Sequence, residues 1–267
     1  MTRLITRAAC ALLFHAFVLA PSANAQEFSA AVSPPRFEFA VDAGERSRQV
    51  IEITNASGQP STYHFRTADW TLDANAGVHF SDELSADSCR PWVAIERREL
   101  EVPAGGRYRF RFEVAPPAGA PARECRFAIM IEGDEQLARG ADGLNLPVSG
   151  RIGVIVYVSV GDVAADLQVV SAGVTDVNGR RVPVLQVNNL GNAHGRLAGF
   201  LQGTDASGRR LEFEPSTLPI LPLETRAIAL TATERPETTA EIAYPVTIKG
   251  VLEWGNARRL EINQLFE

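Results

Sequence analysis

The chain has 267 residues and a formal net charge of −6, and 45% of its residues are hydrophobic. This length suggests one large or two ordinary domains, and the hydrophobic content is sufficient for packed cores. The mild negative charge gives no reason to expect nucleic acid as a partner.

The first residues have the three-part build of a secretory signal peptide. Arg3 and Arg7 give a positive start, an apolar run covers 8–20, and a small-residue site at 23–25 precedes Gln26. We therefore expect residues 1–25 to be cleaved on export. A retained membrane anchor is the alternative, but the apolar run is short for a bilayer core of about 30 Å. No later run reaches about 18 apolar residues, so we expect no membrane span in the mature chain.

Residues 26–161 are filled by short alternating runs separated by Gly, Pro, Asn and Asp, without long helical periodicity. The predicted strands are 32–39, 48–54, 62–70, 92–95, 107–114, 125–132 and 144–160. Such a series of short strands and turns is typical of an immunoglobulin-like sandwich. We interpret Trp70 and Trp92 as residues of its core and 71–90 as a loose polar segment.

One of these strands alternates arginine with aromatic residues: Arg107, Tyr108, Arg109, Phe110, Arg111 and Phe112. Successive side chains of a strand point to opposite faces, so the aromatic rings face the core and the arginines face outward. A row of arginines can bind an anion, although such a row more often forms a solvated strand face.

Gly161 and Asp162 mark the hinge to a second domain, residues 162–267. The hairpin signature of a polar tip between apolar runs occurs three times there, at 175–182, 204–211 and 253–260. Further strands are expected at 182–188, 195–202, 226–231 and 244–254. The predicted fold class is therefore all-β, with two tandem immunoglobulin-like β-sandwich domains.

Cleavage of the signal peptide leaves two cysteines, Cys89 and Cys125. An even pair in an exported chain favours a disulfide bond, and two free buried thiols are the alternative. The scattered histidines do not complete a zinc site with these cysteines. The segment after Asp73 lacks the glycine and glutamate of a calcium loop. We expect no metal, no cofactor and, without a recognisable catalytic constellation, no enzymatic activity.

The long run 144–160 begins with Leu144, Leu146 and Val148, which alternate and so project on one face of a strand. An exposed strand edge can pair with a strand of another protein. An apolar row on such an edge suits insertion into a partner's incomplete core. The alternative is that the row packs inside its own sandwich.

Several segments occur in a characteristic order: 31–36, 51–55, 91–105, 127–132, 144–158 and 184–189. In that order they resemble successive strands and turns of the PapD-type chaperones of pilus assembly by the chaperone–usher route. The resemblance covers most of 31–160 and one strand of the second domain. It implies a non-enzymatic periplasmic chaperone whose partners are pilus or fimbrial subunits and an outer-membrane usher.

The resemblance also implies a site. The strand 144–148 would cap a subunit, while Arg36 and a basic residue late in the donor strand would hold the subunit's C-terminal carboxylate. Gly153 stands where the family has that basic residue, so Arg151, two residues earlier on the same face, is our candidate. Pro147 removes one backbone amide from the donor strand.

A second hypothesis belongs to another class. Exported sandwich modules also serve as non-catalytic structural or adhesive proteins of the cell envelope. In that case the segment 71–90 would bind a surface partner or glycan.

Overall fold

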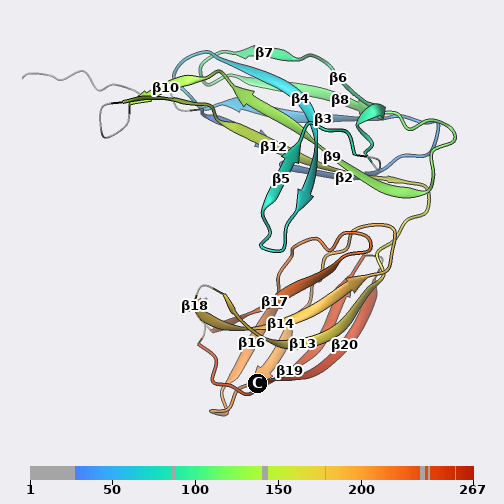
Figure 1. Ribbon diagram of the computed structural model, residues 1–267, viewed down its shortest axis with the longest axis vertical. Helices are drawn as coiled ribbons and strands as arrows, with labels where there is room; N and C mark the ends of the chain where they lie inside the picture. The colour runs from blue at the N-terminus through green and yellow to red at the C-terminus, as the bar shows by residue number, and fades with distance from the viewer. Residues whose placement is uncertain are drawn as a thin grey trace, which may run out of the picture.

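The computed structural model describes residues 28–85, 88–139, 144–177, 179–234, 238–239, 241–255 and 257–267. The predicted signal peptide, 1–25, lies outside the described residues. The described chain is all-β apart from one 3₁₀ turn, η1 (Arg90–Trp92), and forms two domains, one above the other in Figure 1. No helix in these ranges is long and apolar enough to cross a membrane.

The first domain is a sandwich of two sheets with strand orders β1-β3-β8-β6 and β2-β12-β9-β4-β5, and β7 pairs with β4. Its strands are β1 (Ala30–Ser33), β2 (Arg36–Ala40), β3 (Ser47–Asn55), β4 (Ser61–Leu72), β5 (Val78–Ser81), β6 (Val93–Ile95), β7 (Glu99–Val102), β8 (Arg107–Val114), β9 (Arg123–Gly133) and β12 (Arg151–Val160). A separate two-stranded ribbon consists of β10 (Gln136–Arg139) and β11 (Asn145–Val148).

The core of this domain lies between the two sheets. Phe110 and Phe112 of β8 are buried, as the alternation in 107–114 predicts. Phe65 of β4 stacks on Phe110 with ring centroids 4.0 Å apart, and Phe127 of β9 lies edge-on to Phe112. Aromatic side chains from both sheets therefore pack against one another across the sandwich.

The opening strand divides between the two sheets. β1 pairs antiparallel with β3, and after the Pro34–Pro35 bend β2 pairs parallel with β12, placing Arg36 opposite Ile155. Phe37 and Phe39 pack against the core, so Arg36 and Glu38 face outward. This change of sheet brings Arg36 beside the strand that was predicted to contain the partner-binding edge.

Three details of the first domain differ from the sequence interpretation. The first part of the segment 71–90 is not a loose loop, because β4 extends to Leu72 and β5 returns as a hairpin that reaches toward the second domain (Figure 1). The run 144–160 is not one strand but two, β11 and β12. Trp70 lies outside the sandwich core, because it is five residues from buried Phe65 and therefore on the opposite face of β4.

The second domain folds around a core of its own, with the strand order β13-β14-β17-β16-β15-β19-β20 and β18 on β17. Its strands are β13 (Leu167–Val177), β14 (Arg180–Asn189), β15 (Leu201–Thr204), β16 (Arg210–Pro215), β17 (Thr225–Glu234), β18 (Thr238–Thr239), β19 (Val246–Trp254) and β20 (Arg258–Phe266). β17 pairs with β14 through its first half and with β16 through its second half, so it joins the two layers.

The three predicted hairpins of this domain are confirmed. β13 pairs antiparallel with β14, β15 with β16 and β19 with β20, and each pair is joined by a turn at the expected position. Gly179, Gly208 and Gly255 have φ of +77°, +79° and +49°, a left-handed conformation that favours glycine. The segment 195–202 is mostly irregular, with isolated bridges at Gly195 and Ala198 before β15 begins.

Candidate functional site

An uncovered strand edge lies at one side of the first domain. β9 accompanies β12 along its whole length, from Arg151 to Val160, but β2 covers only Ile155–Ser159 on the other side. Among the described strands none pairs with that side of β12 over 151–154. β11 pairs with β10, which continues from β9, so its own outer edge extends the uncovered edge of β12.

The three residues of the predicted apolar row are exposed. Leu144, Leu146 and Val148 are 61%, 52% and 49% exposed. The row lies on β11 and the residue just before it, and Ile152 of β12, after the break at 149–150, packs against the sandwich core. The row thus presents exposed apolar side chains next to the uncovered part of β12.

Gly150, between β11 and β12, marks where the core of this domain ends. A Cβ atom at Gly150 would lie 2.2 Å from the Cγ atom of Phe28, a distance that no side chain can accept. Gly133 of the neighbouring strand also approaches Phe28 closely, and its backbone N–H donates to the Gly150 carbonyl. The ring of Phe28 therefore closes this end of the core, and the β10–β11 ribbon projects past it.

A cluster of charged side chains lies where the uncovered edge meets the second domain. Arg36 and Glu38 share the outward face of β2, and Arg36 Nε lies 2.7 Å from Glu38 Oε1. Two side chains of the second domain approach the same oxygen, with His194 Nε2 at 3.6 Å and Arg196 Nη2 at 3.7 Å. Neither His194 nor Arg196 was a candidate from the sequence, because both lie about 160 residues from Arg36 and in no motif.

His194 is held tightly at the domain junction. Its Nδ1 lies 2.7 Å from Glu124 Oε2, and its backbone N–H donates to Glu124 Oε1 over 2.9 Å. Its ring stacks on Tyr157 of β12 with centroids 3.9 Å apart. Burial raises the pKa of Tyr157 to about 12, so the phenol is neutral at physiological pH, and its oxygen lies 3.5 Å from Arg196 Nη2. These contacts fix the imidazole and guanidinium groups relative to β12.

The structure does not bring Arg151 to Arg36. Arg36 is in register with Ile155, and four residues of strand between Arg151 and Ile155 correspond to about 13 Å. Gly153 is nearer, but the ring of Phe80 of β5 lies over it, and a Cβ there would meet Phe80 Cζ at 2.3 Å. The position that the sequence resemblance assigns to a second basic residue is thus a glycine covered by an aromatic ring.

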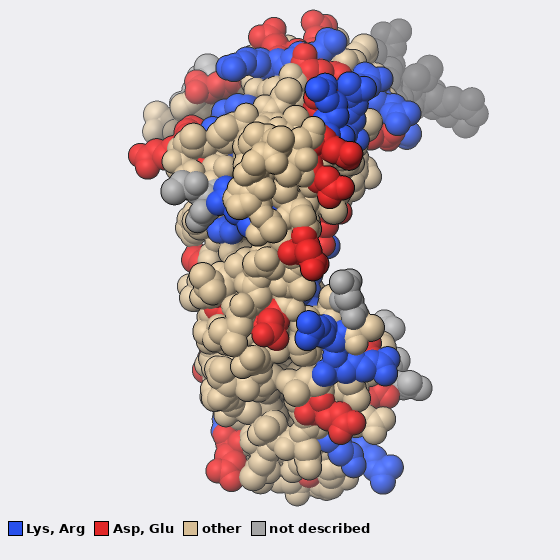
Figure 2. All heavy atoms as spheres, turned by 90° about the vertical axis from the view of Figure 1, so that its right-hand side faces the viewer, with Lys and Arg blue, Asp and Glu red and all other residues tan. Residues whose placement is uncertain are grey.

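The angle between the two domains is fixed by a small apolar cluster and one buried arginine. Leu221 of the second domain packs with Trp70, Tyr157 and Met130 on the outer face of the first domain. Arg226, 4% exposed, donates from Nη1 to the Asp73 carbonyl over 2.9 Å, and from Nη2 to the neighbouring carbonyl of the same hairpin. In profile, the molecule shows a notch between the upper and lower domains (Figure 2).

The predicted disulfide bond is not present, because Cys89 and Cys125 are both free thiols. They are neighbours in the core of the first domain, where a hydrogen bond with Cys125, together with burial, raises the pKa of Cys89. Proximity in the core without a bond corresponds to the alternative of two buried thiols.

The arginine row of β8 and the turn at Asp73, the other candidate binding features of the sequence, do not form an anion site or a metal site in the described residues. The row of arginines on β8 is engaged in ion pairs, Arg111 with Glu96 and Arg107 with Glu52, as expected of a solvated face. Asp73 accepts hydrogen bonds from two backbone N–H groups of its own turn, and the described residues contain no group of acidic, His or Cys side chains able to hold a metal ion.

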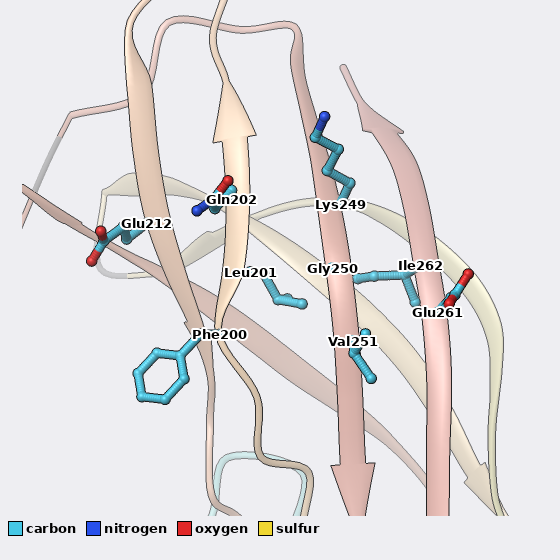
Figure 3. Close-up of a pocket in the computed structure, with 9 residues that line it drawn as sticks. All are labelled: Phe200, Leu201, Gln202, Glu212, Lys249, Gly250, Val251, Glu261 and Ile262. Carbon is cyan, nitrogen blue, oxygen red and sulfur yellow. The ribbon is translucent and has the colours of Figure 1, made fainter.

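A hollow on the second domain lies over β15, β19 and β20. Its side chains diverge in Figure 3, with Phe200 and Glu212 pointing to one side and Glu261 to the other. Gly250 is one of its lining residues, with φ of +151° and Leu201 packed closely against it. A depression without convergent polar groups does not constitute a ligand site.

Comparisons with known proteins give structural likenesses and no sequence match. No protein-family model and no curated protein matches the chain. The solved YadV chaperone is 11% identical, with a TM-score of 0.48, 89% of this chain covered and 99% of that one. The CupB2 chaperone of Pseudomonas aeruginosa is 13% identical, with a TM-score of 0.46 and coverage of 89% and 100%.

A third likeness is to a chain of the complex between the SafA pilin and the SafB chaperone of Salmonella enterica. It is 13% identical, with a TM-score of 0.46 and coverage of 90% and 97%. Each of these three likenesses covers most of this chain and almost the whole of the solved one.

Proposed function

We propose that the protein is an exported, non-catalytic periplasmic chaperone that binds pilus or fimbrial subunits by adding an edge strand to them. The observation that carries the proposal is the exposed apolar row of Leu144, Leu146 and Val148 beside an uncovered edge of β12. The edge offers backbone hydrogen bonds, and the row offers side chains to an incomplete core. A contiguous row of large apolar side chains on a protein surface marks an interaction site.

The geometry of the edge sets the direction of the bound strand. The uncovered edge ends where β2 begins, at Arg36 opposite Ile155. A partner chain whose terminal carboxylate reaches Arg36, and whose last strand lies along the edge, must therefore run parallel to β12. Arg36 then holds the carboxylate by a charge-assisted hydrogen bond, while the apolar row of β11 enters the partner.

Release of the capped subunit would require a second partner that accepts it, which in this proposal is an outer-membrane usher. Residues 1–25 would direct export, as their signal-peptide pattern indicates.

The alternative of an adhesive or structural envelope protein relies on the segment 71–90. Residues 71–81 of that segment belong to the β4–β5 hairpin, and the hairpin tip is engaged by the second domain through Arg226 and the Asp73 carbonyl. Phe80 of the same hairpin covers Gly153. A hairpin already used to join two domains has less surface left for a partner than the uncovered edge has, so strand addition is the better supported function.

The experiment is to mix the purified protein with pilus-type subunits encoded in the same genome and to measure complexes by size-exclusion chromatography with light scattering. We expect a stable one-to-one complex that Arg36→Ala weakens by about 2 kcal/mol, because a buried carboxylate loses its partner. The matched control is Arg48→Ala, an arginine with a 75% exposed side chain, paired with Glu113 on the other sheet. The absence of a complex with every subunit tested would refute the proposal.

A further inference from the structure

The charged cluster at the domain junction has an unusual geometry. One carboxylate oxygen, Glu38 Oε1, is approached by three nitrogen-containing side chains: Arg36 at 2.7 Å, His194 at 3.6 Å and Arg196 at 3.7 Å. Arg36 belongs to the first domain and the other two belong to the second. Such convergence on a single oxygen is the arrangement that a protein uses to bind a carboxylate.

Glu38 satisfies this arrangement only in part. Its oxygen is within hydrogen-bonding distance of Arg36, but 3.7 Å to Arg196 is longer than a hydrogen bond. The backbone of β2, paired in register with β12 at Tyr157, limits how far the carboxylate can move toward Arg196. A carboxylate that is not tethered to β2 has no such limit and can contact both guanidinium groups.

Arg196 is positioned to receive such a group. Its Nη1 donates to the Thr217 carbonyl over 2.8 Å, and its Nη2 lies 3.5 Å from the Tyr157 hydroxyl, so the side chain has one defined orientation. Its Nε is buried and has no hydrogen-bond partner within the described residues. The donor that faces Glu38 is Nη2, which has only long contacts with Tyr157 and Glu38 among the described residues, so it is the atom that a ligand carboxylate would meet.

We infer that the carboxylate clamp of this protein is built across the two domains from Arg36 and Arg196, and that Glu38 occupies it until a chain-terminal carboxylate displaces it. The inference rests on the proposed function, because the ligand is the C-terminus of the bound subunit. Arg196 then provides the second positive charge of the clamp, because position 153 is a glycine covered by Phe80. Glu38 partly neutralises the empty clamp, and a ligand carboxylate must displace it from Arg36 in order to bind.

The test compares two synthetic peptides that carry the last strand of a co-encoded pilus subunit, one with a free C-terminal carboxylate and one with a carboxamide. Binding to the full protein is measured by calorimetry. We expect Glu38→Gln to bind the free-acid peptide about fivefold more tightly than the unmodified protein, as expected for loss of a competing, partly exposed ion pair. Binding of the carboxamide peptide should not change.

Arg196→Gln should weaken binding of the free-acid peptide about tenfold and leave binding of the carboxamide peptide unchanged. A merely structural role of Arg196 would weaken both peptides equally, and that result would overturn the clamp. The matched control is Glu113→Gln, an acidic residue paired with Arg46 and Arg48 on the other sheet, which should change neither peptide.

Two outcomes separate this inference from the proposed function. If both peptides bind the unmodified protein equally and Glu38→Gln has no effect, the strand-binding function stands and the cross-domain clamp is wrong. If neither peptide nor the intact subunit binds, the proposed function fails and the inference falls with it.

Discussion

Leu146 is the position at which strand addition can be tested with the least disturbance of the free protein. Its side chain lies in the middle of the apolar row on β11 and is 52% exposed. Burying a leucine completely contributes roughly 1.5–3 kcal/mol, and about half of that gain is still available when a partner covers the residue. Leu146→Ser loses this half and places a hydroxyl group in the partner's core, so the complex should be weaker by about 2 kcal/mol.

This loss corresponds to a roughly thirtyfold increase in Kd, because 1.4 kcal/mol is a factor of ten. Without a partner, the Leu146→Ser variant should have a free energy of unfolding within about 0.5 kcal/mol of that of the unmodified protein, as expected for an exposed position. The assay is a titration with a pilus subunit, combined with urea unfolding of each free variant.

The matched control is Leu265→Ser on β20 of the second domain, where the leucine is also 52% exposed. It removes the same apolar surface at a site distant from the edge, so it should leave the Kd unchanged. Equal effects of Leu146→Ser and Leu265→Ser on binding would refute the reasoning, and so would a loss of binding explained by unfolding of the Leu146 variant.

Two further predictions concern the second domain. Hydrogen bonds, first from the Ser207 hydroxyl and then from backbone N–H groups, lower the pKa of buried Asp205 from 3.8 to about 2. Its contribution of about 2 kcal/mol is therefore complete above pH ~5 and lost as the pH falls toward 2, and Asp205→Asn should remove this part of the acid dependence of urea unfolding. An unchanged slope between pH 5 and pH 2.5 would contradict this. The side chain of Asn189 is fully buried and donates hydrogen bonds to the Ala193 and Ile220 carbonyls. Asn189→Ala should therefore lower the free energy of unfolding by about 3 kcal/mol. A loss below about 1 kcal/mol would contradict the role assigned to these bonds.

The elements that the sequence predicts well are those with local signals. The alternation in 107–114 places Phe110 and Phe112 in the core because a strand has a period of two. The three hairpin tips of the second domain are identified by polar tips with glycine, whose left-handed backbone a tight turn requires. Both signals act over a few neighbouring residues, so no knowledge of the rest of the fold is needed to interpret them.

The β4–β5 hairpin shows why other features escape such analysis. Its sequence is polar and lacks strong alternation, so 71–90 resembles a loop. It is ordered as a hairpin by distant contacts, with Phe80 against Gly153 and the Asp73 carbonyl on Arg226. Trp70 belongs to the same category, because an aromatic residue of a strand is expected in the sandwich core but here packs with Leu221 of the other domain. Tertiary contacts of this kind override local pattern.

The clamp at the junction depends on this same long-range packing. Arg36 was identified from the opening strand, but its partners come from the second domain and are placed by contacts that no local pattern encodes. Leu221 against Tyr157, and Arg226 on the β4–β5 hairpin, hold the domains at one angle. A rigid junction means that Arg196 is ordered before a ligand arrives, so binding does not have to pay for ordering it. We therefore expect mutations that loosen the junction to weaken recognition of a carboxylate even though they lie outside the clamp.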